Sequence, residues 1–147
     1  MKKIAEEFRN FWKENLEEKY EALPPESAFQ KDRYYYLINE TKMIELKDRA
    51  VFLFTPGSLH YSMLGTNYKS YKQTYDMKID LYTTDGREVS FIEDTILEIL
   101  FDDRKGINPT DHIQYMFLRE ETLNYDEARL VFYPTFNFEL ESYIVQQ

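Results

Sequence analysis

The chain has 147 residues, a length typical of one domain whose core needs no disulfide or metal. It contains no cysteine, which excludes disulfide bonds and thiolate metal sites. Its formal charge of −9 argues against nucleic-acid binding over the whole surface, although a local basic patch stays compatible with it.

The sequence also predicts where the protein resides. The sequence contains no run of about 18 apolar residues, so it predicts no membrane span. The N-terminal residues alternate charged and apolar side chains and lack the continuous apolar segment of a signal peptide. We therefore expect the protein to be made in the cytoplasm and to stay there until it meets its partners.

The first predicted element is an amphipathic helix from Ile4 to Leu23. Apolar residues recur there at steps of three and four, and charged residues fall mostly on the opposite face. Pro24 and Pro25 are expected to end the helix. Its apolar stripe, which includes Trp12, needs a sheet or a neighbouring helix to cover it.

The next segments carry weaker signals. Residues Tyr34 to Ile38 fit either a short strand or part of a loop. Residues Ala50 to Phe54 form a short apolar run typical of a buried strand. Turn-forming residues Thr55 to Ser58 are expected to end that strand. Residues Leu59 to Gln73 show no sustained period and predict a long loop or an extended hairpin tip.

The predicted loop, taken from Leu59 to Lys72, is the candidate partner-contact element. Long loops inside a compact domain are uncommon and often functional. Stacking on single-stranded nucleic acid is a second interpretation, but the acidic balance and the lack of arginine in this loop favour protein contact. The abundant tyrosines of the chain fit both partner contact and a strand-rich fold. The candidate contact residues are Tyr61, Tyr68, Lys69, Tyr71 and Lys72.

A strand, a turn and a helix follow. Residues Gln73 to Tyr82 alternate apolar and polar side chains, the period of a strand with one buried face. Asp85 and Gly86 predict a turn. Ser90 and Glu93 match a capping box at the start of the helix. The helical stripe consists of Ile92, Ile96, Ile99 and Leu100, and Gly106 is the expected C-terminal stop.

Two further strands are predicted near the C-terminus. Ile113, Tyr115 and Phe117 alternate with His112, Gln114 and Met116 in the first of them. Residues Arg119 to Ala128 are expected to form a hairpin loop. The second strand runs from Arg129 to Glu141 with Leu130, Phe132, Phe136, Phe138 and Leu140 on one side. Because Pro134 has no N–H to donate, this strand is expected at a sheet edge or with a bulge.

These elements predict a single domain of the α+β class, spanning residues 1–147. The expected architecture is an antiparallel or mixed sheet, with the N-terminal amphipathic helix and the second helix packed on one face.

No reactive constellation is visible in the sequence. The chain has two histidines, His60 and His112, and neither has a second ligand at metal-binding spacing. A cation held by Asp102, Asp103, Asp111 and His112 is weighed against a solvated acidic helix end, and the latter is favoured because the calcium-loop pattern is missing. Phosphate-binding glycine loops and nucleophile elbows are also missing. We expect no catalytic residue, metal or cofactor.

Two stretches resemble the tail-terminator and tail-completion proteins of tailed viruses. "TYDMKIDLYTTDGREVSFIEDTILEIL" is similar to an alternating strand, a polar turn and a helix of the pattern x-x-I-x-D-x-I-x-x-x-L in that family. "ARLVFYPTFNFELE" resembles its final strand. The resemblance covers residues 1–22 and 71–141, and the chain departs from it between Phe29 and Ser70, where the family has a shorter section.

The resemblance implies a structural protein of the virion that is not an enzyme. Members form a ring, commonly a hexamer, that caps the tail tube and joins it to the neck. The implied partners are other copies of the chain, the tail tube protein and neck or adaptor proteins, while DNA passes without specific binding. Another neck adaptor, a small cytoplasmic interaction module and an enzyme with an unrecognised site are the alternatives.

Overall fold

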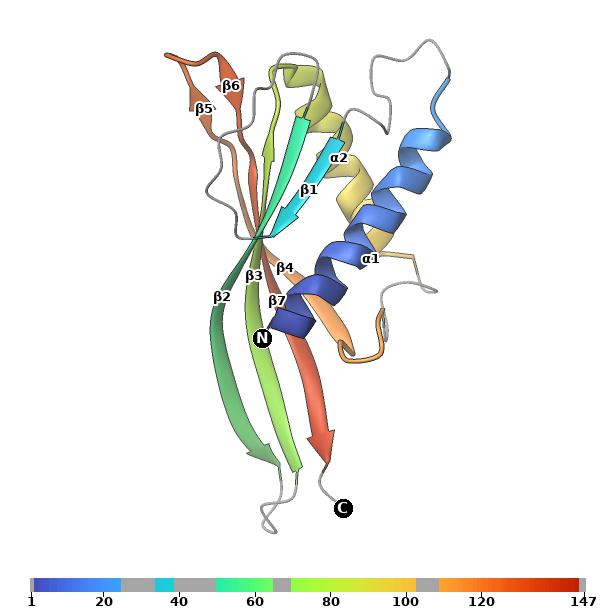
Figure 1. The fold of residues 1–147 in the computed structure, drawn as a ribbon, viewed down its shortest axis with the longest axis vertical. Coiled ribbons are helices and arrows are strands. Elements are labelled where there is room, and N and C mark those ends of the chain that lie inside the picture. The colour runs from blue at the N-terminus through green and yellow to red at the C-terminus, as the bar shows by residue number, and fades with distance from the viewer. Residues whose placement is uncertain (1, 25–33, 39–49, 65–69, 103–108, 146–147) are drawn as a thin grey trace.

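The computed structural model describes residues 2–24, 34–38, 50–64, 70–102 and 109–145. In these residues a five-stranded sheet of order β1-β2-β3-β7-β4 carries two helices on one face (Figure 1). Strands β1 and β2 are parallel, and the other neighbours are antiparallel. The mixed sheet and its two helices confirm the predicted α+β class. The elements are α1 (Lys2–Glu21), β1 (Tyr34–Ile38), β2 (Ala50–Leu64), β3 (Ser70–Tyr82), α2 (Gly86–Leu100), β4 (Tyr115–Thr122), β5 (Tyr125–Asp126), β6 (Val131–Phe132) and β7 (Thr135–Val145).

Helix α1 covers the sheet with the apolar stripe that its sequence predicts. Phe8 and Trp12 are fully buried. The Phe8 ring lies 5.9 Å from the Phe54 ring of β2, and the Trp12 ring lies 5.3 Å from the Phe138 ring of β7, measured between centroids. Aromatic contacts of this kind add to the stabilisation that the stripe gains from the area it removes from water. The helix ends at Glu21, three residues before Pro24.

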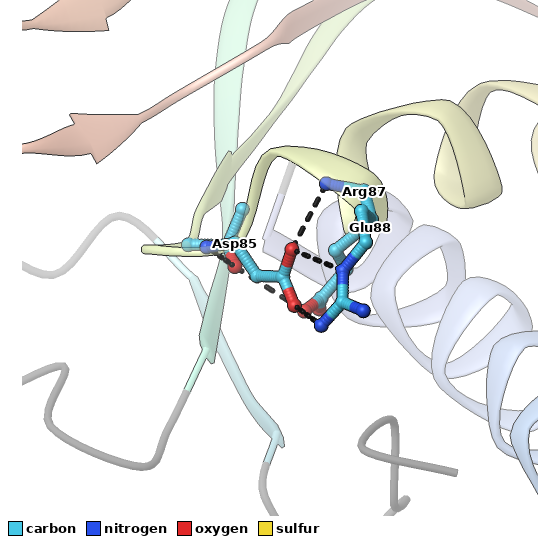
Figure 2. A network of polar contacts seen from close by, with 4 residues as sticks. Asp85, Arg87 and Glu88 are labelled. Atoms are coloured by element: carbon cyan, nitrogen blue, oxygen red, sulfur yellow. Dashed lines mark hydrogen bonds and ion pairs between the residues drawn. The ribbon is translucent and has the colours of Figure 1, made fainter.

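The N-cap of helix α2 lies five residues before Ser90, the N-cap of the predicted capping box. Its N-cap is Asp85, whose Oδ1 accepts a hydrogen bond from the backbone N–H of Arg87 at 3.0 Å (Figure 2). Ser90 is an exposed residue inside the helix, so the capping-box prediction is wrong. Asp85 is the preferred cap because its carboxylate reaches the free N–H groups of the first turn. The helix ends at Leu100, and Gly106, its expected stop, lies outside the described residues.

The predicted turn at Thr55 to Ser58 and the loop interpretation of Leu59 to Gln73 are wrong where the structure describes them, whereas the alternative of an extended hairpin agrees with the antiparallel pairing of β2 with β3. Strand β2 continues through the turn-forming residues with a register shift between Pro56 and Leu59. The residues that do not fit the regular ladder form a β-bulge there. The neighbouring strand lies close to Gly57, because a Cβ on this residue would lie only 3.1 Å from Asp76 Cβ. Residues 59–64 and 70–73 then pair as strands, which leaves 65–69 between them.

The predicted strand from Arg129 to Glu141 is divided into two parts. Leu130 has a φ of 55°, a left-handed conformation that interrupts extended backbone. Val131 and Phe132 pair instead with β5, in a separate two-stranded hairpin that occupies part of the predicted loop from Arg119 to Ala128. Strand β7 starts only at Thr135.

Strand β7 is not at an edge, contrary to the prediction drawn from Pro134. It lies between β3 and β4 and pairs with both. Pro134 immediately precedes the strand, and its carbonyl accepts a hydrogen bond from the Leu81 N–H at 3.1 Å. The proline therefore removes no donor from the ladder, and its position says nothing about the edge.

The far ends of β2, β3 and β7 continue past the helices as a curved three-stranded extension (Figure 1). We call residues 60–64, 70–74 and 141–145 the blade. Residues 60, 74 and 141 pair in register at its base, and residues 64, 70 and 145 pair near its tip. The blade and the β5–β6 hairpin lie at opposite ends of the molecule (Figure 1).

Candidate contact surfaces

Three of the five predicted contact residues lie in the described part of the blade. Tyr61, on β2, exposes 61% of its surface. Tyr71 and Lys72 are half-buried on β3. Tyr68 and Lys69 lie outside the described residues.

The structure divides these three residues between the two faces of the blade. Tyr61 lies opposite Gln73, so it shares a face with Tyr71 and with the helix-covered side of the sheet. Lys72 points to the other face, where its Nζ lies 3.8 Å from Glu141 Oε1. The predicted residues therefore do not form one patch, because neighbouring residues of a strand point to opposite faces.

The helix-free face of the sheet carries a network of ion pairs. Besides the Lys72–Glu141 pair, Lys78 lies 3.7 Å from Asp80, and Arg119 is paired with Glu139. A hollow of about 420 Å³ opens at the β2 bulge between Gly57, Asp76, Lys78, Arg119 and Asn137. Lys78 and Arg119 in this hollow each lie beside a carboxylate, and Asp76 Oδ2 lies 4.0 Å from His60 Nε2.

An aromatic strip occupies the same face beside strand β4, which is an outermost strand of the sheet. It consists of Tyr115, Phe117 and Tyr143, which expose 39%, 37% and 40% of their surfaces. The Tyr115 ring centroid lies 6.1 Å from that of Phe117 and 6.3 Å from that of Tyr143. The Arg119 guanidinium lies over the Phe117 ring at 5.0 Å. We call these four residues the edge strip.

Sequence reasoning missed the edge strip because it placed Tyr115 and Phe117 on the same side as Ile113. Ile113 is fully buried but precedes the strand, so the alternation restarts at Tyr115. Within β4, Met116 points into the core, opposite Leu140, and the two rings point outward.

Two carboxylates meet where α2 approaches β4. Partial burial and the neighbouring carboxylate of Glu93 raise the pKa of Glu121 to about 7. Glu93 belongs to α2 and Glu121 to β4. Contact between the helix and this strand therefore costs more free energy as the pH rises, since like charges repel at short range.

A buried group of tyrosines lies between α1, β1 and α2. The Tyr20 and Tyr34 rings stack at 4.2 Å, and the Tyr36 ring stacks on Phe52 at 5.2 Å. Burial is the main cause that raises the pKa of Tyr20 well above its usual value. The Tyr20 hydroxyl thus stays protonated near neutral pH, and the three tyrosine rings belong to the hydrophobic core.

The described residues contain no cluster of three or more His, Asp or Glu side chains able to hold a metal ion. His112, one member of the weighed cation group, instead lies 3.0 Å from the carboxylate of Glu7 through its Nδ1. No helix in the described ranges is long and apolar enough to span a membrane.

Comparison with known proteins gave no match, neither to a protein-family model nor to a curated protein.

Proposed function

We propose that the chain is a non-enzymatic subunit of a ring at the end of a viral tail tube, where it joins the tube to the neck. The observation that carries this proposal is the blade. It extends the sheet beyond the helices and leaves Tyr61 and Tyr143 exposed, and a monomer gains little stability from strands that the helices do not cover.

A ring requires each subunit to use two different surfaces that fit each other. The blade offers one, with Tyr61 exposed on the face that it shares with Tyr71. The β5–β6 hairpin at the opposite end offers another, because Leu123 and Leu130 expose 65% and 64% of their surfaces there. Apolar side chains on a projecting hairpin favour contact with a neighbouring molecule.

The charge of the chain supports the same proposal. With a formal charge of −9, a ring of several copies repels a nucleic acid that passes through it and does not hold it in place. The resemblance of the strand-turn-helix segment and of the final strand to tail-terminator proteins supports the location in the virion.

The test is electron microscopy of the purified chain at high concentration and of particles that contain it. We expect image averages of a closed cyclic ring with an axial opening wide enough for duplex DNA. The paired substitutions Tyr61→Ser and Tyr71→Ser should abolish the ring, whereas Leu97→Ser, at an exposed site on α2, should leave it intact. A chain that never forms a ring and is absent from particles would overturn the proposal.

A further inference from the structure

We infer that two copies of the free chain pair through strand β4, antiparallel to each other, about a two-fold axis at Phe117. Strand β4 pairs with β7 on one side, and on its other side none of the strands in the described part of the chain pairs with it. Exposed sheet edges are normally protected by charges, prolines or bulges. In β4, however, the four residues from Tyr115 to Leu118 contain no charge, proline or glycine.

The protection begins only at the next residue. Arg119 is the extra residue of a β-bulge between Leu118 and Glu120, and it is followed by Glu120 and Glu121. A bulge bends the strand and ends regular pairing. The edge therefore offers one short segment for pairing, Tyr115 to Arg119, which has Phe117 at its centre.

This segment complements itself. With the axis at Phe117, the two Phe117 rings lie side by side on the outer face. Tyr115 of each copy then lies opposite Arg119 of the other, which allows a cation–π contact like the one that Arg119 makes with Phe117. On the inner face Met116 lies opposite Leu118 of the second copy, which joins two apolar side chains at the border of the two cores.

Neighbouring registers lack this complementarity. An axis at Leu118 places Met116 opposite Glu120, which sets an apolar side chain against a carboxylate. An axis at Arg119 places the two guanidiniums opposite each other, and like charges in that position are destabilising. An axis at Met116 places Leu118 opposite Gln114 and gives Arg119 no aromatic partner.

The charges of the chain select the same register. Two copies that each carry a formal charge of −9 repel each other, so a contact must keep its acids apart. With the axis at Phe117, the paired segment from Tyr115 to Arg119 contains no carboxylate, and Glu120 and Glu121 lie beyond the bulge that ends regular pairing. No carboxylate of this segment then faces a carboxylate of the second copy. The third ring of the edge strip, Tyr143, lies against Tyr115 and widens the contact.

This inference does not depend on the proposed function. A two-fold contact uses the same surface on both copies and cannot close a ring by itself, so it describes the subunit before it is built into a larger assembly. The segment is short, and we therefore expect a dimer that dissociates on dilution.

Cysteine cross-linking tests the axis directly, because the chain has no cysteine of its own. Opposite residues of an antiparallel pair have Cβ atoms about 4.5–5.5 Å apart, close to the distance that a disulfide needs. Under mild oxidation Phe117→Cys should give at least about tenfold more disulfide-linked dimer than Phe101→Cys, a control at a more exposed site that exposes 80% of its surface. Equal yields would overturn the inference.

Two further measurements make the register testable even if one variant folds poorly. A mixture of Tyr115→Cys and Arg119→Cys chains should cross-link more than either chain alone, and the reverse result would overturn the register. Sedimentation of the unmodified chain should show a dimer that dissociates on dilution, and a monomer at every concentration would overturn the pairing. A ring in which Phe117→Cys does not cross-link would support the proposed function and contradict this inference.

Discussion

The same three strands form two regions of different character. In the half of the sheet under the helices, β2, β3 and β7 contribute Phe54, Met77 and Phe138, all of which are buried. In the blade, the same strands continue in the same antiparallel arrangement, yet Tyr61 is largely exposed. The pairing of the backbones is alike in both halves, and what differs is the presence of α1.

The comparison teaches that cover, rather than strand pairing, determines burial in this molecule. Main-chain hydrogen bonds hold both halves together, but under the helices Phe54, Met77 and Phe138 are also removed from water, whereas Tyr61 in the blade is not. We therefore expect substitutions under the helices to cost far more stability than substitutions in the blade.

The largest effect is expected at Trp12. The substitution Trp12→Ala removes a fully buried ring from its contacts with Phe8, Phe11 and Phe138, and it should lower the free energy of unfolding by about 3–5 kcal/mol. Chemical denaturation followed by circular dichroism measures it.

The control is Trp12→Phe, which keeps an aromatic ring at the site. It also removes the buried Trp12 Nε1–H, which has no hydrogen-bond partner among the described residues. We expect it to cost less than half as much as the alanine variant. An unchanged unfolding midpoint in Trp12→Ala would contradict the importance of helix cover.

A smaller effect is expected at the start of the second covering helix. Asp85→Ala removes the side chain that accepts the Arg87 N–H, and it should cost about 1 kcal/mol. Ser90→Ala, within the helix, should change stability by less than about 0.5 kcal/mol, because alanine favours the helix and no cap is lost. Thermal unfolding of both variants shows which residue caps the helix. A larger loss of stability in Ser90→Ala than in Asp85→Ala would support the capping box at Ser90 and contradict the cap at Asp85.

The contact between α2 and β4 should depend on pH. The pKa of Glu121, about 7 in the folded protein, is above its ordinary value of 4.5. The folded state therefore loses stability as the pH rises from about 4.5 to about 7, and the loss stays complete above that range. Glu121→Gln should flatten this dependence, so that the variant matches the unmodified chain at pH 4 and is slightly more stable at pH 8.

Urea unfolding at several pH values between 4 and 8 provides the measurement, and Glu120→Gln, on the same strand, is the control. Because the site is partly solvated, the gain at pH 8 should be well below that of the helix cap. If Glu121→Gln leaves the dependence of stability on pH unchanged, the pair of Glu93 and Glu121 does not make the α2–β4 contact depend on pH.

The smallest effect on stability is expected in the blade. Tyr61→Ser replaces a largely exposed side chain, and it should change the free energy of unfolding by less than about 0.5 kcal/mol. The same chemical denaturation experiment that detects Trp12→Ala should hardly distinguish this variant from the unmodified chain. A loss of several kcal/mol would show that the blade is part of the core. It would contradict the expectation that substitutions in the blade cost less stability than substitutions under the helices.

The two regions also differ in how well their sequences predict them. Helix α1 was predictable because its cover of the sheet imposes a helical period on Phe8, Trp12 and Leu16. In the blade, residues 59–64 were predicted as loop. A strand shows its period of two only where one face is buried and the other is wet. Without that asymmetry, Tyr61 and its neighbours carry no pattern that separates strand from loop.

Local turn chemistry misled the prediction at two other places. Thr55 to Ser58 has the composition of a turn, but a β-bulge uses the same residues without reversing the chain. Pro134 suggested an edge strand, but its position one residue before β7 spares the ladder. In both cases the sequence identifies an irregularity, and only the tertiary pairing decides its kind.

The edge strip illustrates a different limit. Tyr115 and Phe117 have the composition of core residues, and their exposure depends on where the strand begins. A shift of one residue in register exchanges the two faces, which a single sequence cannot resolve.

The position of β7 inside the sheet has a consequence for synthesis of the protein. Asp80 and Thr135 are neighbours across the ladder but are 55 residues apart in the chain. While a ribosome is still making residues 135–145, β3 and β4 have no strand between them, and their apolar side chains stay open to other molecules. Folding must therefore wait for nearly the whole chain, and contacts of such long range also predict slow refolding. Chains that are released early would carry two unpaired strand edges and should aggregate rather than fold.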